Sequence, residues 1–70
     1  MTEGYKIGDW VFSEDYGRGA GEVIMDLGDG LLRAVFARAE ATVRTYAVRR
    51  ATDEEIAAAR QVRQAREASR

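Results

Sequence analysis

Two aromatic residues, Trp10 and Phe12, are the side chains of this sequence best suited to recognising a partner. They lie in an apolar run at residues 9–13, where the alternation of a β-strand would place both on the face opposite Val11. Exposed there, they would form an aromatic hot spot for a protein or a platform on which bases stack. The alternative is a C-terminal helix that folds back over them, because so small a domain needs additional packing. The sequence leaves both interpretations open.

Arginine is the second residue type suited to binding, since Lys6 is the single lysine among 11 basic residues. Guanidinium groups bind phosphate through a planar fork, and such binding weakens strongly with salt. The candidates for a nucleic-acid-binding face are Arg33, Arg38, Arg44, Arg49, Arg50, Arg60, Arg63 and Arg66. The alternative is a solvated face that is partly paired with glutamates. The net charge of −1 favours this alternative, because nucleic-acid-binding domains are usually basic overall.

The residue types that are missing exclude much enzyme chemistry. The 70 residues include no Cys, no His and no Pro. Without Cys and His there is no thiolate chemistry, no Ser-His-Asp or Cys-His catalysis, and no zinc site built from these residues. The glycines at positions 17, 19 and 21 do not form a nucleotide-binding fingerprint, because a strand-like segment follows them where that fingerprint requires a helix. We therefore expect a protein that is not an enzyme and uses no metal or cofactor.

Short apolar runs and one helix must position these side chains. Strands are predicted over residues 9–13, 22–27, 31–36 and 42–46, with a last short turn or strand over residues 47–50. Alternation predicts a core of Ile7, Val11, Val23, Met25, Leu27, Leu32, Ala34 and Phe36. Thr52 and Glu55 fit a capping box that begins a helix over residues 52–70. Short strands separated by regular turns indicate a small barrel or sandwich.

Four segments of the first fifty residues carry a resemblance to known domains. They are Lys6-Ile7-Gly8-Asp9-Trp10-Val11, then Tyr16-Gly17-Arg18-Gly19-Ala20-Gly21-Glu22-Val23, then Leu32-Arg33-Ala34-Val35-Phe36, then Ala41-Thr42-Val43-Arg44. This part of the chain resembles the small SH3-like or Tudor-like barrels of bacterial nucleic-acid machines. Examples are the RNA polymerase-interacting domains of CarD-type proteins and of the transcription-repair coupling factor, and the C-terminal Tudor-like domain of UvrD/PcrA-type helicases.

The resemblance implies a mainly β fold, a small SH3-like (Tudor-like) barrel of four to five antiparallel strands, to which the capping box adds a C-terminal α-helix. The barrel would span residues 1–51 and the helix residues 52–70, within one domain. The implied function is that of a non-enzymatic adapter in bacterial transcription or DNA repair. It would dock on a larger protein, such as RNA polymerase or a helicase subunit, through a strand edge and through Trp10, Phe12, Tyr16 and Arg18.

Two other functions stay open at the level of sequence. One is direct nucleic-acid binding through the arginines. The other is a self-associating regulatory protein, borne by a phage or plasmid, whose helix pairs across a homodimer. No apolar run approaches the roughly 20 residues of a membrane span, and the N-terminus lacks the pattern of a signal peptide. We therefore expect a cytoplasmic protein without a membrane partner.

Overall fold

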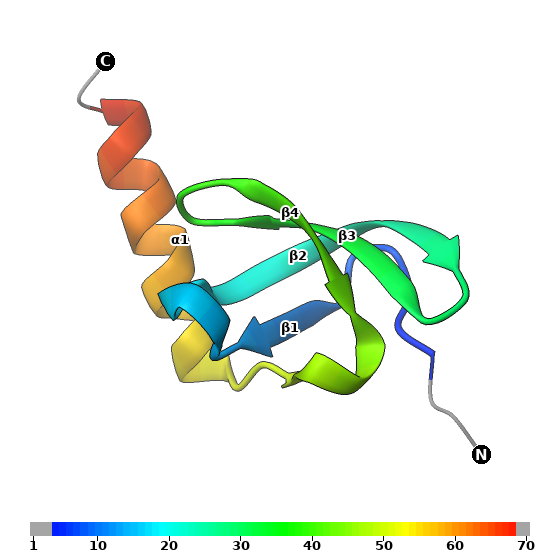
Figure 1. Cartoon of the computed structure of the whole chain (residues 1–70). Coiled ribbons are helices and arrows are strands. Elements are labelled where there is room, and N and C mark those ends of the chain that lie inside the picture. The colour runs from blue at the N-terminus through cyan, green and yellow to red at the C-terminus, as the bar shows by residue number, and fades with distance from the viewer. Residues whose placement is uncertain (1–3, 69–70) are drawn as a thin grey trace.

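A computed structural model describes residues 4–68, apart from the side chains of Tyr16, Arg66 and Ala68. The elements are β1 (Trp10–Ser13), the 3-10 turn η1 (Asp15–Gly17), β2 (Gly19–Gly28), β3 (Leu31–Phe36), β4 (Glu40–Arg44), the 3-10 turn η2 (Thr45–Ala47), β5 (Val48–Arg50) and α1 (Asp53–Ala68). Figure 1 shows α1 standing at one end of the sheet and the β2–β3 turn lying at the other.

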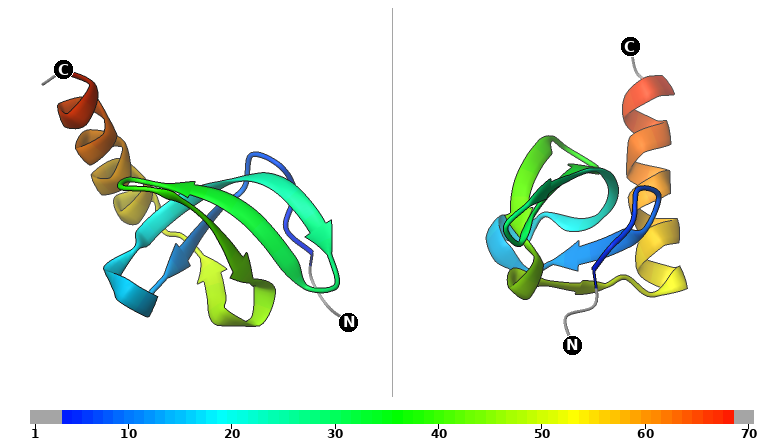
Figure 2. Two further views of the ribbon diagram at one scale, coloured as in Figure 1. Left: turned by 45° about the horizontal axis from the view of Figure 1, so that its top comes forward. Right: turned by 90° about the vertical axis from the view of Figure 1, so that its right-hand side faces the viewer.

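The five strands form one antiparallel sheet in the order β4-β3-β2-β1-β5. The prediction of a small, mainly β fold with a C-terminal helix is confirmed. The two views in Figure 2 show that the sheet is strongly curved. It is nevertheless open, since in the described part of the chain β4 and β5 are its two edges and do not pair with each other. The sheet is therefore curved like the expected barrel but does not close into one.

Strand β2 begins earlier than predicted, at Gly19 rather than at residue 22. Gly19 and Gly21, which suggested a turn, are instead part of the strand, whereas Gly17 is in η1. Gly21 lies opposite Phe36 in the register with β3, and a Cβ atom at Gly21 would lie 2.6 Å from Cδ1 of that ring. The glycine thus allows the Phe36 ring to lie directly against the backbone of β2.

The fourth strand is shifted in the opposite direction. It covers Glu40–Arg44 rather than residues 42–46, because the chain turns into η2 at Thr45. The backbone N–H of Thr45 donates to the carbonyl oxygen of Gly30, 2.8 Å away. Of the two alternatives for residues 47–50, the short strand is correct: β5 pairs with β1.

The core consists of six buried side chains: Val11, Val23, Leu32, Ala34, Phe36 and Val43. Five of these were predicted from alternation. The prediction is wrong for Ile7, Met25 and Leu27, which are 71%, 49% and 43% exposed. Ile7 lies in a turn before β1. Irregularities in the β2–β3 pairing, between Val23 and Met25 and again before Gly28, interrupt the alternation, and such bulges redirect side chains away from the core.

Helix α1 starts with the predicted capping box. The N–H of Thr52 donates to Oε1 of Glu55 at 2.9 Å, and the N–H of Glu55 donates to Oγ1 of Thr52 at 3.2 Å. The first half of the helix packs on the outer face of the sheet, where Ala59 is buried, and the second half extends beyond the sheet (Figures 1 and 2). No helix among residues 4–68 is both long and apolar enough to cross a membrane.

Candidate binding groove between the helix and the sheet

The aromatic pair of β1 is half-buried beneath arginine side chains. The guanidinium carbon of Arg60, from α1, lies 5.4 Å from the centre of the Trp10 ring. That of Arg49, from β5, lies 4.4 Å from the centre of the Phe12 ring. Both distances are typical of cation–π contacts. The structure therefore shows the arrangement in which the C-terminal part of the chain covers much of this pair.

Most of the predicted arginine face is engaged within the chain. Ion pairs link Arg33 to Glu40, Arg49 to Glu55, Arg50 to Asp9 and Arg63 to Glu22. Arg44 lies over the Tyr46 ring, at 5.9 Å from its centre. The side chain of Arg66 lies outside the described residues. Arg38 is exposed and lines a hollow in the surface.

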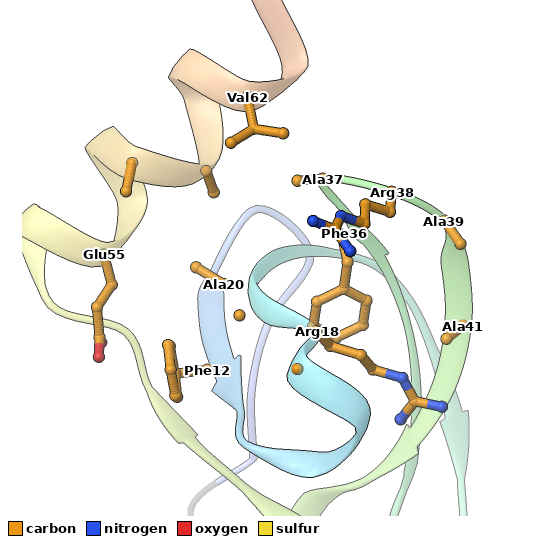
Figure 3. A pocket seen from close by; sticks show the side chains of 14 residues that line it. Phe12, Arg18, Ala20, Phe36, Ala37, Arg38, Ala39, Ala41, Glu55 and Val62 are labelled. Atoms are coloured by element: carbon orange, nitrogen blue, oxygen red, sulfur yellow. The ribbon is translucent and has the colours of Figure 1, made fainter. Parts of the chain in front are cut away.

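That hollow is an apolar groove between α1 and the end of the sheet. It has a volume of about 440 Å³. Its helix wall is formed by Ala58, Ala59 and Val62, and its sheet wall by Phe12 and Phe36. Figure 3 shows these walls on either side of the open space, with the β3–β4 turn bordering it. We refer to this hollow as the groove.

Two arginines give the groove a positive charge. Arg18 follows η1 and lies with its guanidinium carbon 6.0 Å from the centre of the Phe36 ring, and Arg38 comes from the β3–β4 turn (Figure 3). Glu55 also lines the groove and is bonded to Arg49. An apolar surface bordered by guanidinium groups is suited to an apolar side chain with a carboxylate beside it.

The groove contains only part of the site predicted from the sequence. Of the four predicted partner-binding residues, Phe12 and Arg18 line it, whereas Trp10 lies under Arg60 and the Tyr16 side chain is outside the described residues. Sequence reasoning assigned Phe36 to the core alone and did not identify Val62. Ala58 and Val62 are four positions apart and so share one face of the helix, which was the available signal for Val62, but nothing local indicated what would lie opposite it.

The ion pair between Arg49 and Glu55 holds the start of α1 on the sheet. Nη1 and Nη2 of Arg49 donate to the two carboxylate oxygens of Glu55 at 2.9 and 2.6 Å. This hydrogen bonding, together with that from the N–H of Thr52, lowers the pKa of Glu55 from its ordinary value of 4.5 to about 2. The same bonding to Glu55 raises the pKa of Arg49. Because Arg49 also lies on Phe12, the pair connects β1, β5 and α1.

Acid is expected to weaken helix docking through Glu55. Its pKa is lower in the folded protein than in the unfolded chain, so its contribution to stability is fully present above about pH 4.5 and is lost as the pH falls towards 2. Glu55→Gln should remove this contribution at neutral pH and flatten the dependence of stability on pH in that window. Urea unfolding followed by circular dichroism between pH 2 and 7 measures both effects.

The matched control for this experiment is Glu54→Gln, which neutralises an exposed carboxylate in the same helical turn. It should keep the wild-type pH dependence. Identical pH profiles for the Glu55→Gln and Glu54→Gln variants would show that the ion pair with Arg49 does not hold the helix.

Comparisons of this chain with protein-family models, with curated proteins and with solved structures find no match. The resemblance to RNA polymerase-interacting and Tudor-like domains therefore stays a prediction. The chemistry of the groove is the remaining guide to what the protein binds.

Proposed function

We propose that this protein is a non-enzymatic protein-binding module whose groove takes an apolar segment flanked by carboxylates. The observation that carries the proposal is the combination of apolar walls, Phe12, Phe36 and Val62, with the guanidinium groups of Arg18 and Arg38. Apolar side chains that enter such a groove are removed from water, which favours binding. Carboxylates beside them form charge-assisted hydrogen bonds with arginine, which fix the orientation of the segment.

A protein segment fits this surface better than nucleic acid does. Stacking of bases needs an open aromatic face, and Arg60 lies over the Trp10 ring. Phosphate binding needs arginines that are accessible together, and four of the eight candidates are paired with carboxylates. These contacts support protein binding as the first function to test.

The edge of the sheet supports an adapter role. Strand β4 is one edge, so one side of its backbone is not paired within the sheet. Ala41 of this strand also lines the groove. An extended segment that pairs with β4 would therefore run beside the groove, and edge pairing of this kind supplies backbone hydrogen bonds to many peptide-binding domains. On the earlier resemblance, RNA polymerase or a helicase subunit of a bacterial repair system is the larger partner to test first.

A peptide titration tests the proposed chemistry directly. The probe is a synthetic peptide of two leucines flanked on each side by two aspartates, added to isotope-labelled protein in an NMR experiment. Shifts are expected at Phe36, Arg38 and Val62. Arg38→Glu should weaken binding about tenfold, the value of roughly one charge-assisted hydrogen bond. Arg44→Glu, a charge reversal outside the groove, should leave binding unchanged.

Two results would contradict the proposal. The first is equal binding of a control peptide in which lysines replace the aspartates, since the arginines would then have no role. The second is binding of a DNA or RNA oligonucleotide at about 50 mM salt that is tighter than binding of the acidic peptide. Either result would assign the arginines of this protein to another ligand.

A further inference from the structure

The end of β2, next to the turn into β3, exposes a second apolar surface. Ile24, Met25 and Leu27 are 37%, 49% and 43% exposed. In a regular strand, Met25 and Leu27 would share the buried face of Val23, but the two irregularities in the pairing with β3 interrupt the alternation and leave them exposed. Large apolar side chains that the fold itself directs outward are typical of an interaction surface. We refer to residues 24–30 as the hairpin tip.

The hairpin tip is acidic as well as apolar. Asp26 and Asp29 lie beside its apolar residues and are exposed. No basic residue occurs between positions 19 and 32, and Arg33, which lies opposite Met25 in the pairing with β3, forms an ion pair with Glu40. The hairpin tip therefore has the composition that the groove is suited to bind, an apolar segment with carboxylates on either side of Leu27.

The hairpin tip and the groove lie at opposite ends of the molecule. The protein measures 41 × 21 × 21 Å, with α1 and the groove at one end of the structure and the β2–β3 turn at the other (Figures 1 and 2). One copy cannot bring its own hairpin tip into its own groove over this distance. A second copy can do so without any change in either fold.

We propose that the hairpin tip of one copy docks into the groove of a second copy. This inference rests on the proposed function and names the segment that the groove takes. Leu27 and Met25 would lie against Phe36 and Val62, and the carboxylate of Asp29 would lie near Arg18 or Arg38. The contact is heterologous, because the two copies use different surfaces, so each added copy leaves a free groove and a free hairpin tip. The expected product is a head-to-tail chain of copies rather than a closed dimer.

The self-association should be weak, because one turn inserted into one groove buries much less than the roughly 1,000 Å² of a stable interface. A larger protein with a similar segment can then compete for the same groove. We expect the average mass of the wild-type protein to rise between about 10 µM and 1 mM in sedimentation or light-scattering measurements. Because exposed charges contribute, about 0.5 M salt should reduce the effect.

Two variants that each lack one surface provide the decisive test. Leu27→Lys alters the hairpin tip and keeps the groove, whereas Arg38→Glu alters the groove and keeps the hairpin tip. Each variant alone should associate at least tenfold more weakly than the wild type at 1 mM. An equimolar mixture should form a 1:1 dimer and nothing larger, because only one intact pair of surfaces remains. Gln64→Lys adds the same charge at an exposed position of α1 outside the groove and should associate like the wild type.

A second variant of the hairpin tip keeps the proposal testable if Leu27→Lys fails to fold. Asp29 has a φ of 54°, a conformation that asparagine also adopts readily, so Asp29→Asn removes the charge without strain. It should weaken self-association at least threefold. Wild-type circular dichroism is required of every variant before its mass is interpreted.

Several outcomes would overturn this inference. They are a wild-type protein that is monomeric at 1 mM, single variants that associate like the wild type, or a mixture whose mass exceeds that of a dimer. Titration of the acidic leucine peptide into the Leu27→Lys variant distinguishes a failure of the self-association proposal from a failure of the proposed function. If the peptide binds while the wild type stays monomeric, the groove binds another protein and self-association is wrong. If neither occurs, both proposals fail.

Discussion

Leu32→Ala is expected to unfold most of the protein at room temperature. Leu32 is 1% exposed and is among the largest fully buried side chains of the core. Replacing a buried leucine by alanine costs about 2–5 kcal/mol, through lost burial and the cavity that remains. A domain of this size gains only roughly 3–5 kcal/mol from its core. With no Cys in the sequence, no disulfide can offset the loss.

Urea unfolding followed by circular dichroism measures this effect. The matched control is Leu27→Ala, the same substitution at a side chain that is 43% exposed. We expect the control to lower the free energy of unfolding by no more than about 0.5 kcal/mol. Similar losses for the two variants would show that the core is not centred on the inner face of the sheet.

Gly21→Ala should have the second largest effect on stability. The added Cβ would lie 2.6, 2.7 and 2.9 Å from Cδ1, Cε1 and Cγ of Phe36. The ring cannot turn away freely, because Phe36 is 3% exposed and is part of the packed core. Overpacking of this kind costs about 1–3 kcal/mol. Because Phe36 also forms one wall of the groove, the remaining folded protein should bind the acidic leucine peptide more weakly.

The control for this prediction is Gly4→Ala, since a Cβ at Gly4 would meet no atom within 4 Å. It should leave both stability and peptide binding at wild-type values. Comparison of the two variants by urea unfolding and by NMR titration checks the prediction. If Gly21→Ala were as stable as Gly4→Ala, the close contact between Phe36 and β2 would not exist in solution.

The sequence predicted the order of elements well, because the signals for it act over a few residues. Glycine-containing turns separated the strands, and the capping box of Thr52 and Glu55 placed the start of the helix within one residue. Alternation also identified Val11 and Leu32 as core residues. The largest error in the strand boundaries is at the start of β2, which is Gly19 rather than residue 22. Gly21 was interpreted as part of a turn, but it lies within the strand and allows Phe36 to pack closely.

The candidate site was predicted only in part, because its walls come from distant segments. Phe12 and Val62 are fifty positions apart and meet across the groove only because α1 packs on the outer face of the sheet. The interpretation of the arginines depended on the same packing. No local pattern places Arg60 over Trp10 or Arg49 over Phe12.

The sequence by itself therefore determined the elements, most of the core and the absence of Cys- and His-based chemistry, since residue types and short-range spacing decide these. Only the tertiary structure decided which side chains are exposed and which of them lie together in the groove or at the hairpin tip. The irregular pairing of β2 with β3 exposed Met25 and Leu27, and the docking of α1 placed Arg60 over Trp10 and formed the groove. Both depend on pairing between segments distant in the chain, which is why neither the hairpin tip nor the groove could be identified from the sequence.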